Sequence, residues 1–285
     1  MQLFYQLEEY RDDRKPVVLT IGNFDGVHRG HLAVLRCAQE FAAGKSQTMV
    51  LTFSNHPSKI LRPQHPICLL CTLEHRIRLI EACGIDSLLL LPFTNHLAKH
   101  SAASFIERLR QHIPFTHLVL GHDATLGRDR QGSRAVMKEL GQDWGFNVHY
   151  LEEHRYEGHP ISSTRIRELL QNGDLEGVEA LLGRPFSIYS KVIPVPGVDQ
   201  TSELSTFQIN VEGLCLPPLG SYEVVVKKGE EPIPATAHLR AASSNDAEKE
   251  IASVLLEVHL PSPHNFDKEV EVILLTSLIC EEKII

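Results

Sequence analysis

Two histidines and several glycines lie close together near the start of the chain, in the segment TIGNFDGVHRGH at residues 20–31. His28 and His31 are three residues apart, a spacing that brings both side chains to one side of a helix. Glycines such as Gly22 and Gly30 allow the backbone to approach a ligand closely. Each imidazole can donate a hydrogen bond to a phosphate oxygen, and a helix N-terminus favours an anion. The segment therefore predicts a phosphate-binding site.

An isolated HxxH pair is ordinarily no more than two solvent-facing histidines at a helix start. Here an apolar, β-branched run at residues 17–21 precedes the motif and a helical pattern at residues 31–42 follows it. Ligands of open α/β sheets bind beyond the carboxyl ends of the strands, where this motif would lie. The spacing fits neither the P-loop GxxxxGK[ST] nor the dinucleotide fingerprint GxGxxG. The context favours a ligand site of a different kind.

Three consecutive hydroxyl side chains open a second predicted helix, in the segment ISSTRIR at residues 161–167. One hydroxyl is enough to cap a helix, so capping is the structural explanation of this segment. Three hydroxyls together with Arg165 and Arg167 exceed what a cap needs. Hydroxyl and guanidinium groups at a helix N-terminus are suited to a polyphosphate, which makes this the second candidate site.

The first 150 residues alternate between strand-like and helical patterns about every 30 residues, the length of one βα unit. Predicted strands lie at residues 17–21, 48–53, 87–92, 116–120 and 147–151. Predicted helices lie at residues 31–42, 72–82, 101–111 and 134–144. Such alternation is typical of right-handed βαβ units, so we expect an α/β fold with a Rossmann-like, doubly wound parallel sheet.

The second half of the chain has a different pattern. Two short helices are predicted at residues 164–171 and 175–182, the second capped by Asp174 and ended by Gly183. From residue 186 onward, strand-like runs separated by Pro, Gly, Asn and Ser predict a small antiparallel β-barrel or sandwich. We therefore expect two domains, residues 1–185 and residues 186–285.

Composition excludes several classes of protein. The 285 residues are 42% hydrophobic and 22% charged, which is ordinary for a soluble globular protein and not for a disordered one. The net charge of −8 argues against a broad nucleic-acid surface. No apolar run is long enough to span a membrane and no signal-peptide pattern is present, so we expect a cytoplasmic protein without a membrane partner.

Four segments, in order, resemble the bacterial FAD synthetase family of HxGH-type nucleotidylyltransferases. They are GNFDGVHRGH at residues 22–31, TFSNHP at residues 52–57, GHDATLG at residues 121–127 and ISSTRIR at residues 161–167. This family usually joins an N-terminal FMN adenylyltransferase to a C-terminal riboflavin kinase. The resemblance covers residues 15–186 and implies ATP, FMN and FAD as partners, with riboflavin added if the kinase is active.

The resemblance implies roles for the residues at matching positions. The implied catalytic residues, which stabilise the transferring phosphate or hold the β- and γ-phosphates of ATP, are His28, His31, Ser163, Thr164 and Arg167. The implied remainder of the ATP site is Gly22, Asn23, Phe24, Gly30, Ile161 and Ser162. The implied flavin side is Phe53, His56, Pro57, Gly121, Asp123, Leu126 and Gly127. Mg²⁺ is the implied cofactor with Asp123 as a metal ligand, a solvated loop aspartate being the alternative.

In the implied reaction the protein contributes little covalent chemistry of its own. The FMN phosphate attacks the α-phosphorus of ATP, pyrophosphate leaves and FAD forms. An ionised phosphate needs no general base, so catalysis rests on alignment and on neutralising charge.

Two features of the first 185 residues depart from the family pattern. Asn55 stands where the family's TFxPHP segment has proline, and Ala124 and Leu126 stand where GxDFxFG has aromatic residues. Smaller side chains in that loop are expected to pack less tightly on the flavin. The lost contact is expected to cost about 1–3 kcal/mol of binding free energy and so to raise the KM for FMN.

The second domain departs further. The kinase's GxxxGRxLGFPTAN segment corresponds to residues 195–208, where most glycines and the arginine are missing. Only Thr206 remains of the pair that holds Mg²⁺ in the family, and Glu257 stands at the position of the catalytic base, an edge charge being the alternative. We expect a degenerate kinase-like barrel that has lost riboflavin kinase activity. A fully bifunctional enzyme, a non-enzymatic flavin- or nucleotide-binding module, and a nucleotidylyltransferase of another substrate remain the alternatives.

Overall fold

The computed structural model describes residues 1–11, 15–195, 204–229, 231–241, 254–264, 266 and 269–278. The chain divides into two compact units. The first unit consists of Met1–Ile67 and Arg76–Ile161, and the second consists of Cys68–His75 and Ser162–Ile285. No helix in these described ranges is long and apolar enough to cross a membrane.

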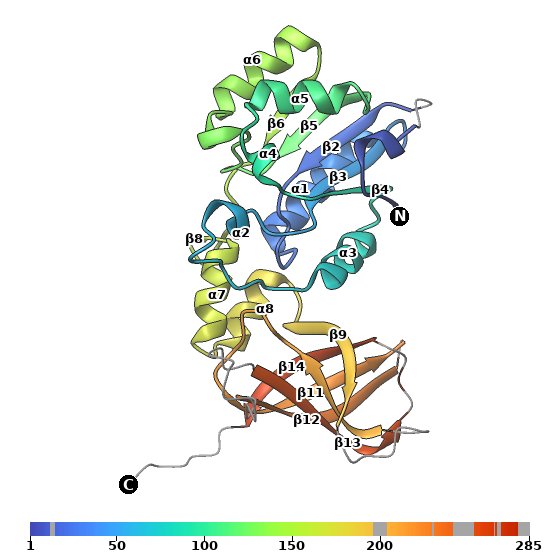
Figure 1. Cartoon of the computed structure of the whole chain (residues 1–285), viewed down its shortest axis with the longest axis vertical. Coiled ribbons are helices and arrows are strands. Elements are labelled where there is room, and N and C mark those ends of the chain that lie inside the picture. Colours follow the sequence, from blue (N-terminus) through green and yellow to red (C-terminus); the bar gives the residue numbers. More distant parts are fainter. Residues whose placement is uncertain are drawn as a thin grey trace. The chain divides into compact units, whose positions relative to one another are not determined.

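A six-stranded parallel sheet forms the centre of the first unit, with strand order β1-β4-β3-β2-β5-β6 (Figure 1). The strands are β1 Gln2–Phe4, β2 Val17–Ile21, β3 Gln47–Phe53, β4 Ser87–Leu91, β5 Phe115–Leu120 and β6 Asn147–Tyr150. The helices are η1 Leu7–Glu9, α1 Arg29–Ala42, α2 Ser58–Leu61, α3 Leu73–Ala82, α4 Asn95–Ala98, α5 Ala102–Arg110, η2 Arg128–Arg130 and α6 Arg134–Trp144. A two-stranded ribbon of β7 Arg155–Tyr156 and β8 His159–Pro160 follows β6.

Apolar residues alternate between the two faces of the central strand β2, and each face packs against different helices. Val17 and Leu19 lie in one core cluster with apolar residues of α5 and α6. Val18 lies in another cluster with Val34 and Ala38 of α1. Helices therefore cover both faces of the sheet, as the doubly wound prediction requires.

The strand order brings three of the candidate segments to one edge of the sheet. Strands β3, β2 and β5 are neighbours and run parallel. The segments at residues 22–31, 52–57 and 121–127 lie at or just beyond the carboxyl ends of β2, β3 and β5. In open α/β sheets this edge is where ligands bind.

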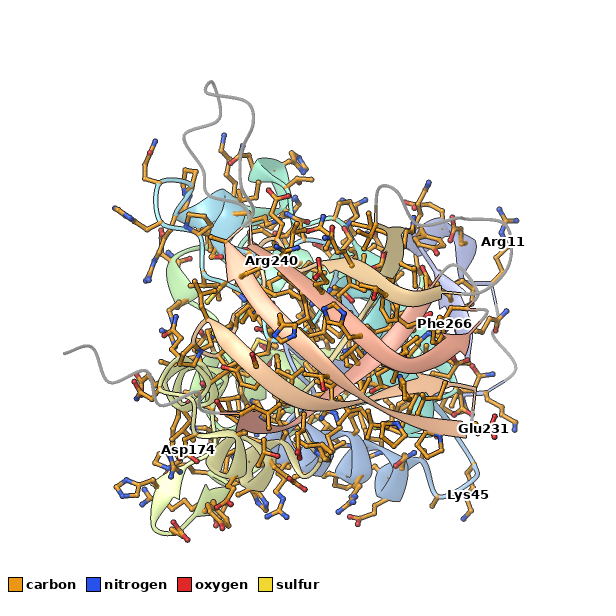
Figure 2. The ribbon with its side chains drawn as sticks, turned by 90° about the horizontal axis from the view of Figure 1, so that it is seen from below. Arg11, Lys45, Asp174, Glu231, Arg240 and Phe266 are labelled. Carbon is orange, nitrogen blue, oxygen red and sulfur yellow. The ribbon has the colours of Figure 1, made fainter. Side chains whose placement is uncertain are left out.

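The second unit contains two helices and a closed antiparallel barrel with order β10-β13-β12-β11-β14-β9. Figure 2 looks onto the barrel and shows Glu231 and Arg240 at opposite ends of β12. The elements are α7 Ser163–Gln171, α8 Leu175–Leu182, β9 Ser187–Pro194, β10 Leu204–Asn210, β11 Gly220–Lys228, β12 Glu231–Ala241, β13 Val254–His264 and β14 Glu269–Leu278.

The start of α8 follows the prediction, since the Asp174 carboxylate accepts a hydrogen bond from the Gly177 backbone N–H at 2.8 Å. Helices α7 and α8 belong to the same unit as the barrel, so the division between the units falls before Ser162. The assignment of residues 1–185 and 186–285 as functional domains stays a prediction.

Candidate active site

The loop between β2 and α1 is held in an unusual backbone conformation. Phe24 and Val27 have φ values of 51° and 39°, and Gly26 between them has 76°. A side chain in this left-handed region costs about 1–2 kcal/mol. Phe24 and Val27 are each 1% exposed and pack in one core cluster with Leu35 of α1, and this burial offsets the strain. Strained backbone that is held in place by packing is typical of functional loops.

The two histidines of this loop lie face to face. Their rings stack with centroids 3.7 Å apart and planes 14° from parallel. His28 is also the N-cap of α1, where its Nδ1 accepts a hydrogen bond from the His31 backbone N–H at 3.3 Å. A Cβ on Gly30 would lie 3.1 Å from the His28 ring, so the glycine leaves room for this stacking. The shared orientation of His28 and His31 is as predicted, whereas the capping role of His28 was not predicted from the sequence.

His31 has a ring nitrogen that the protein leaves without a partner. Its Nδ1 is shielded from solvent and makes no hydrogen bond. The Phe24 ring lies 5.1 Å from the His31 ring. Burial, with smaller contributions from His28 and Arg76, holds the pKa of His31 well below its usual range. The imidazole is thus neutral near pH 7, and its unsatisfied nitrogen is of the kind that a bound ligand completes.

Arg76 of α3 joins this loop to the next one and was not predicted from the sequence. Its Nη1 donates to the Asn23 carbonyl at 2.8 Å, and its Nη2 donates to the Phe53 carbonyl at 2.5 Å. Thr52 Oγ1 donates to the same Asn23 carbonyl at 3.1 Å. The only sequence signal was an arginine on the buried face of a predicted helix.

Asn55, which replaces the family's proline, ties the loop after β3 to the loop after β4. Its side-chain amide donates to the Phe93 carbonyl at 2.9 Å and accepts from the Phe93 N–H at 2.8 Å. The Phe53 and Phe93 rings meet edge to face at 5.1 Å. The amide therefore supplies a two-point anchor for this loop.

His56 and Pro57 form the turn into α2. The Ser58 N–H donates to His56 Nδ1 at 3.1 Å, and the Ser58 hydroxyl lies 2.9 Å from the same nitrogen. Pro57 is the N-cap residue of α2. The structure thus fixes the His56 ring by contacts on its Nδ1 side.

The loop after β5 is closed by a short bridge and a close backbone contact. Leu126 and Gly132 exchange backbone hydrogen bonds of 2.9 and 3.3 Å. Gly127 has a φ of +76°, and a Cβ there would lie 2.3 Å from the Ala102 backbone nitrogen. Ala124 and Leu126 pack against the core cluster on this side of the sheet. The loop is therefore fitted to the start of α5, with its smaller side chains turned to the core.

Asp123 is an exposed loop carboxylate. Its side chain is 76% exposed, and its Oδ1 lies 3.8 Å from Nδ1 of His122. Within the ranges that the structure describes, no group of three His, Cys, Asp or Glu side chains could hold a metal. A single carboxylate still fits Mg²⁺, which is commonly bound by one or two carboxylates, water and substrate phosphates.

The hydroxyl segment lies in the second unit, apart from Ile161, which is the last residue of the first. Ser162 is the N-cap of α7 and accepts from the Arg165 N–H at 3.2 Å, as the capping explanation predicts. Ser163 and Thr164 begin the helix and are additional to that cap. Arg167 donates from Nε to the Cys68 carbonyl at 2.7 Å.

The kinase-like residues meet in a polar network on the outer face of the barrel, since the alternate residues of β10 and β13 form the core. Glu257 Oε2 accepts from Gln208 Nε2 at 2.9 Å and from the Arg240 guanidinium. His259 Nε2 lies 3.1 Å from Glu257 Oε1, and His259 Nδ1 lies 3.2 Å from the Thr206 hydroxyl.

The hydrogen bonds and charges of this network set the pKa of Glu257. The hydrogen bond from Gln208, with Arg240 and His259 beside it, lowers the pKa of Glu257. The strand that carries it, β13, is paired on both sides, so the alternative of an edge charge does not apply. The altered segment at residues 196–203 lies outside the described residues.

Comparison with known proteins gives a consistent result. A family model described as FAD synthetase matches residues 10–165. A bifunctional riboflavin kinase/FMN adenylyltransferase of Escherichia coli K12 is 32% identical over 225 residues, 78% of this chain and 72% of its own length. A protein of the same name from Haemophilus influenzae is 34% identical, over 81% of this chain and 76% of its own length.

Solved structures support the fold. A crystal structure titled as a macrolide-efflux protein from Streptococcus pneumoniae matches with a TM-score of 0.76 at 23% identity, and the match covers 97% of this chain and 90% of that one. At this identity the likeness concerns the fold alone. The family model, the two relatives and the candidate residues at the carboxyl edge of the sheet agree with one another. The chain belongs to the FAD synthetase family.

Proposed function

We propose that the chain is an FMN adenylyltransferase, which transfers AMP from ATP to FMN and releases FAD and pyrophosphate. The observation that carries the proposal is the unpartnered, shielded Nδ1 of His31, stacked on His28 at the N-terminus of α1. This is a hydrogen-bonding position without a protein partner at the ligand edge of the sheet. The names of the curated relatives supply the substrate class.

In the proposed reaction one bond forms and one breaks. A phosphate oxygen of FMN bonds to the α-phosphorus of ATP, and the bond from that phosphorus to the pyrophosphate oxygen breaks. His31 is neutral at working pH, because its pKa is lowered, and it donates a hydrogen bond without carrying a proton away. His28 accepts a backbone N–H at Nδ1, so its neutral ring is protonated at Nε2 and donates from there. Both rings and the positive end of α1 then oppose the developing negative charge.

The remaining site residues are assigned on the family resemblance. Ser163, Thr164 and Arg167 bind the β- and γ-phosphates, supported by the two hydroxyls that α7 has beyond its cap. The turn at residues 56–57 and the loop at residues 121–127 line the flavin side. Mg²⁺, when bound, neutralises phosphate charge, and Asp123 is the residue proposed to face it.

Riboflavin kinase activity is proposed to be absent. Both oxygens of Glu257 are engaged, by Gln208 and Arg240 on one and by His259 on the other. A carboxylate with a lowered pKa is a weaker base, which disfavours abstraction of a proton from a riboflavin hydroxyl. Because the curated relatives are named as bifunctional, retained kinase activity is the alternative to be tested.

The histidine site is tested by replacing His28 and His31 with alanine, separately, in the full chain. Each substitution is expected to lower FAD formation from FMN by about 100-fold or more, because a donor to the transition state is lost. His65→Ala is the matched control, since His65 is exposed in the same unit, and it is expected to match the wild type. Unchanged turnover in His31→Ala would refute the site. Flavin binding without turnover in the wild type would favour the binding-module alternative.

A further inference from the structure

Arg76 is a buried cation that spans two segments of the proposed site. Its residue is 6% exposed, an unusual position for an arginine unless its charge is compensated. The two terminal nitrogens of the guanidinium group donate to different loops, one to the Asn23 carbonyl and the other to the Phe53 carbonyl. Two backbone carbonyls therefore receive hydrogen bonds from this buried cation.

The two carbonyls mark the carboxyl ends of adjacent strands. Asn23 lies just after β2, in the loop that leads to the stacked histidines, and Phe53 is the last residue of β3. A guanidinium group is planar and rigid, so two hydrogen bonds from it fix the separation of their acceptors. A lysine ammonium at the same place would supply the charge without this fork geometry.

The same cation also acts on His31. The His31 ring contacts the rings of Phe24 and His28, both from the loop after β2, and Arg76 of α3 acts on it through its charge. Positive charge from Arg76 adds to burial and to His28 in lowering the pKa of His31. Removal of the guanidinium is therefore expected to change two properties, the relative position of the two loops and the pKa of His31.

We propose that Arg76 is a positioning residue of the nucleotide-transfer site, which holds the loop after β2 in fixed relation to the loop after β3. The identity of the two substrates rests on the proposed function, whereas the hydrogen bonds belong to the chain itself. Arg76 acts through the two carbonyls and touches neither substrate. The loop after β2 carries the ATP side and the loop after β3 carries the flavin side, so the clamp sets the alignment of the FMN phosphate with ATP.

The test compares Arg76→Met, Arg76→Lys and the control Arg78→Met in the full chain. Arg78 is an exposed residue of the same helix, so its variant removes an arginine from the same helix and leaves the clamp intact. Kinetics of FAD formation give kcat and the KM for FMN. NMR of ¹³C-labelled histidine gives the titration of His31, independently of activity.

Arg76→Met is expected to lower kcat/KM for FMN by about 10- to 100-fold, since small misplacements of reacting groups are costly. Its His31 is expected to titrate at a higher pH than in the wild type. Arg76→Lys keeps the charge and therefore the wild-type titration of His31, but it raises the KM for FMN because the fork is lost. Arg78→Met is expected to match the wild type in all three measurements.

The proposal is overturned if Arg76→Met leaves both kcat/KM and the His31 titration unchanged. If Arg76→Met does not fold, the proposal is tested with Arg76→Lys instead. A wild-type KM for FMN in Arg76→Lys would refute the role of the two guanidinium hydrogen bonds. If the wild-type chain forms no FAD, the proposed function fails. The His31 titration in the variants still tests the effect of Arg76.

Discussion

Gly127 provides a test of how tightly the loop after β5 is built. Its φ is +76°, and a Cβ there would lie 2.3 Å from the Ala102 nitrogen and 2.9 Å from the Ala102 Cα, both backbone atoms of α5. Gly145, at the end of α6, has nearly the same φ of +72° but open space around its missing Cβ. The two glycines differ in ψ, which is 173° at Gly127, in a region occupied almost only by glycine, and 42° at Gly145, in the left-handed helical region. Gly127→Ala therefore carries both a greater backbone strain and the collision, whereas Gly145→Ala carries left-handed strain alone.

The magnitudes follow from this geometry. Gly145→Ala is expected to cost about 1–2 kcal/mol of unfolding free energy, the cost of a side chain in the left-handed region. Gly127→Ala adds a collision with backbone that cannot rotate away, and overpacking typically costs about 1–3 kcal/mol more. Backbone strain of about 1–3 kcal/mol at the φ and ψ of Gly127 brings the total for Gly127→Ala to roughly 2–6 kcal/mol. Because the loop must shift to relieve the collision, we also expect a higher KM for FMN in Gly127→Ala only.

The assay is urea unfolding followed by the fluorescence of Trp144, the single tryptophan of the chain, which lies in the first unit. With a slope of about 2 kcal/mol per molar urea, Gly127→Ala should have a midpoint about 1 M below that of Gly145→Ala. Equal midpoints for the two variants would show that the loop does not pack against α5 as described. If Gly127→Ala is destabilised but its KM for FMN is unchanged, the loop after β5 does not contribute to FMN binding.

Three further predictions concern other parts of the molecule. Asn55→Ala removes both hydrogen bonds to the Phe93 backbone, so it should lower the stability of the first unit by about 1–3 kcal/mol and raise the KM for FMN, measured by unfolding and by kinetics. Because the pKa of His31 is lowered in the folded state, the unfolded chain takes up this proton first as the pH falls below about 6.5. The wild type should therefore lose more stability than His31→Asn between pH 7.5 and 5.5, and equal losses would contradict the lowered pKa. Glu257→Gln should leave FAD formation from FMN unchanged and reduce the stability of the barrel at pH 7, since Arg240 loses its carboxylate partner.

Local patterns predicted the sheet of the first unit well. The predicted strands at residues 17–21 and 116–120 agree with β2 and β5 within one residue, because short runs rich in β-branched and apolar residues mark strands. The strand β1 was missed because three residues at Gln2–Phe4 are too few to show a period. Its pairing with β4 is a long-range contact that the sequence does not reveal.

The strand β12 was missed for a different reason. Pro232 and Pro234 lie within it, and proline argues against a strand in a sequence-based prediction. Among the residues that the structure describes, these two prolines pair with β11 alone, since the described pairing of β12 with β13 begins at Thr236. Proline is tolerated there because no described strand on the other side takes up its missing N–H.

The sequence identified many residues of the candidate site but not the contacts between them. The histidine motif indicated that the two rings share one side, and the hydroxyl segment indicated the cap at Ser162. The carbonyl contacts of Arg76 depend on the neighbouring positions of β2 and β3, which no local pattern encodes. The same holds for Glu257, whose partners come from two other strands of the barrel.

The central claim is tested most directly by incubating the purified full chain with Mg²⁺ and ATP, with either FMN or riboflavin, and separating the flavins by chromatography. We predict FAD from FMN, and neither FMN nor FAD from riboflavin. FMN or FAD from riboflavin would contradict the loss of kinase activity. No FAD from FMN, with a folded protein, would contradict the adenylyltransferase account itself.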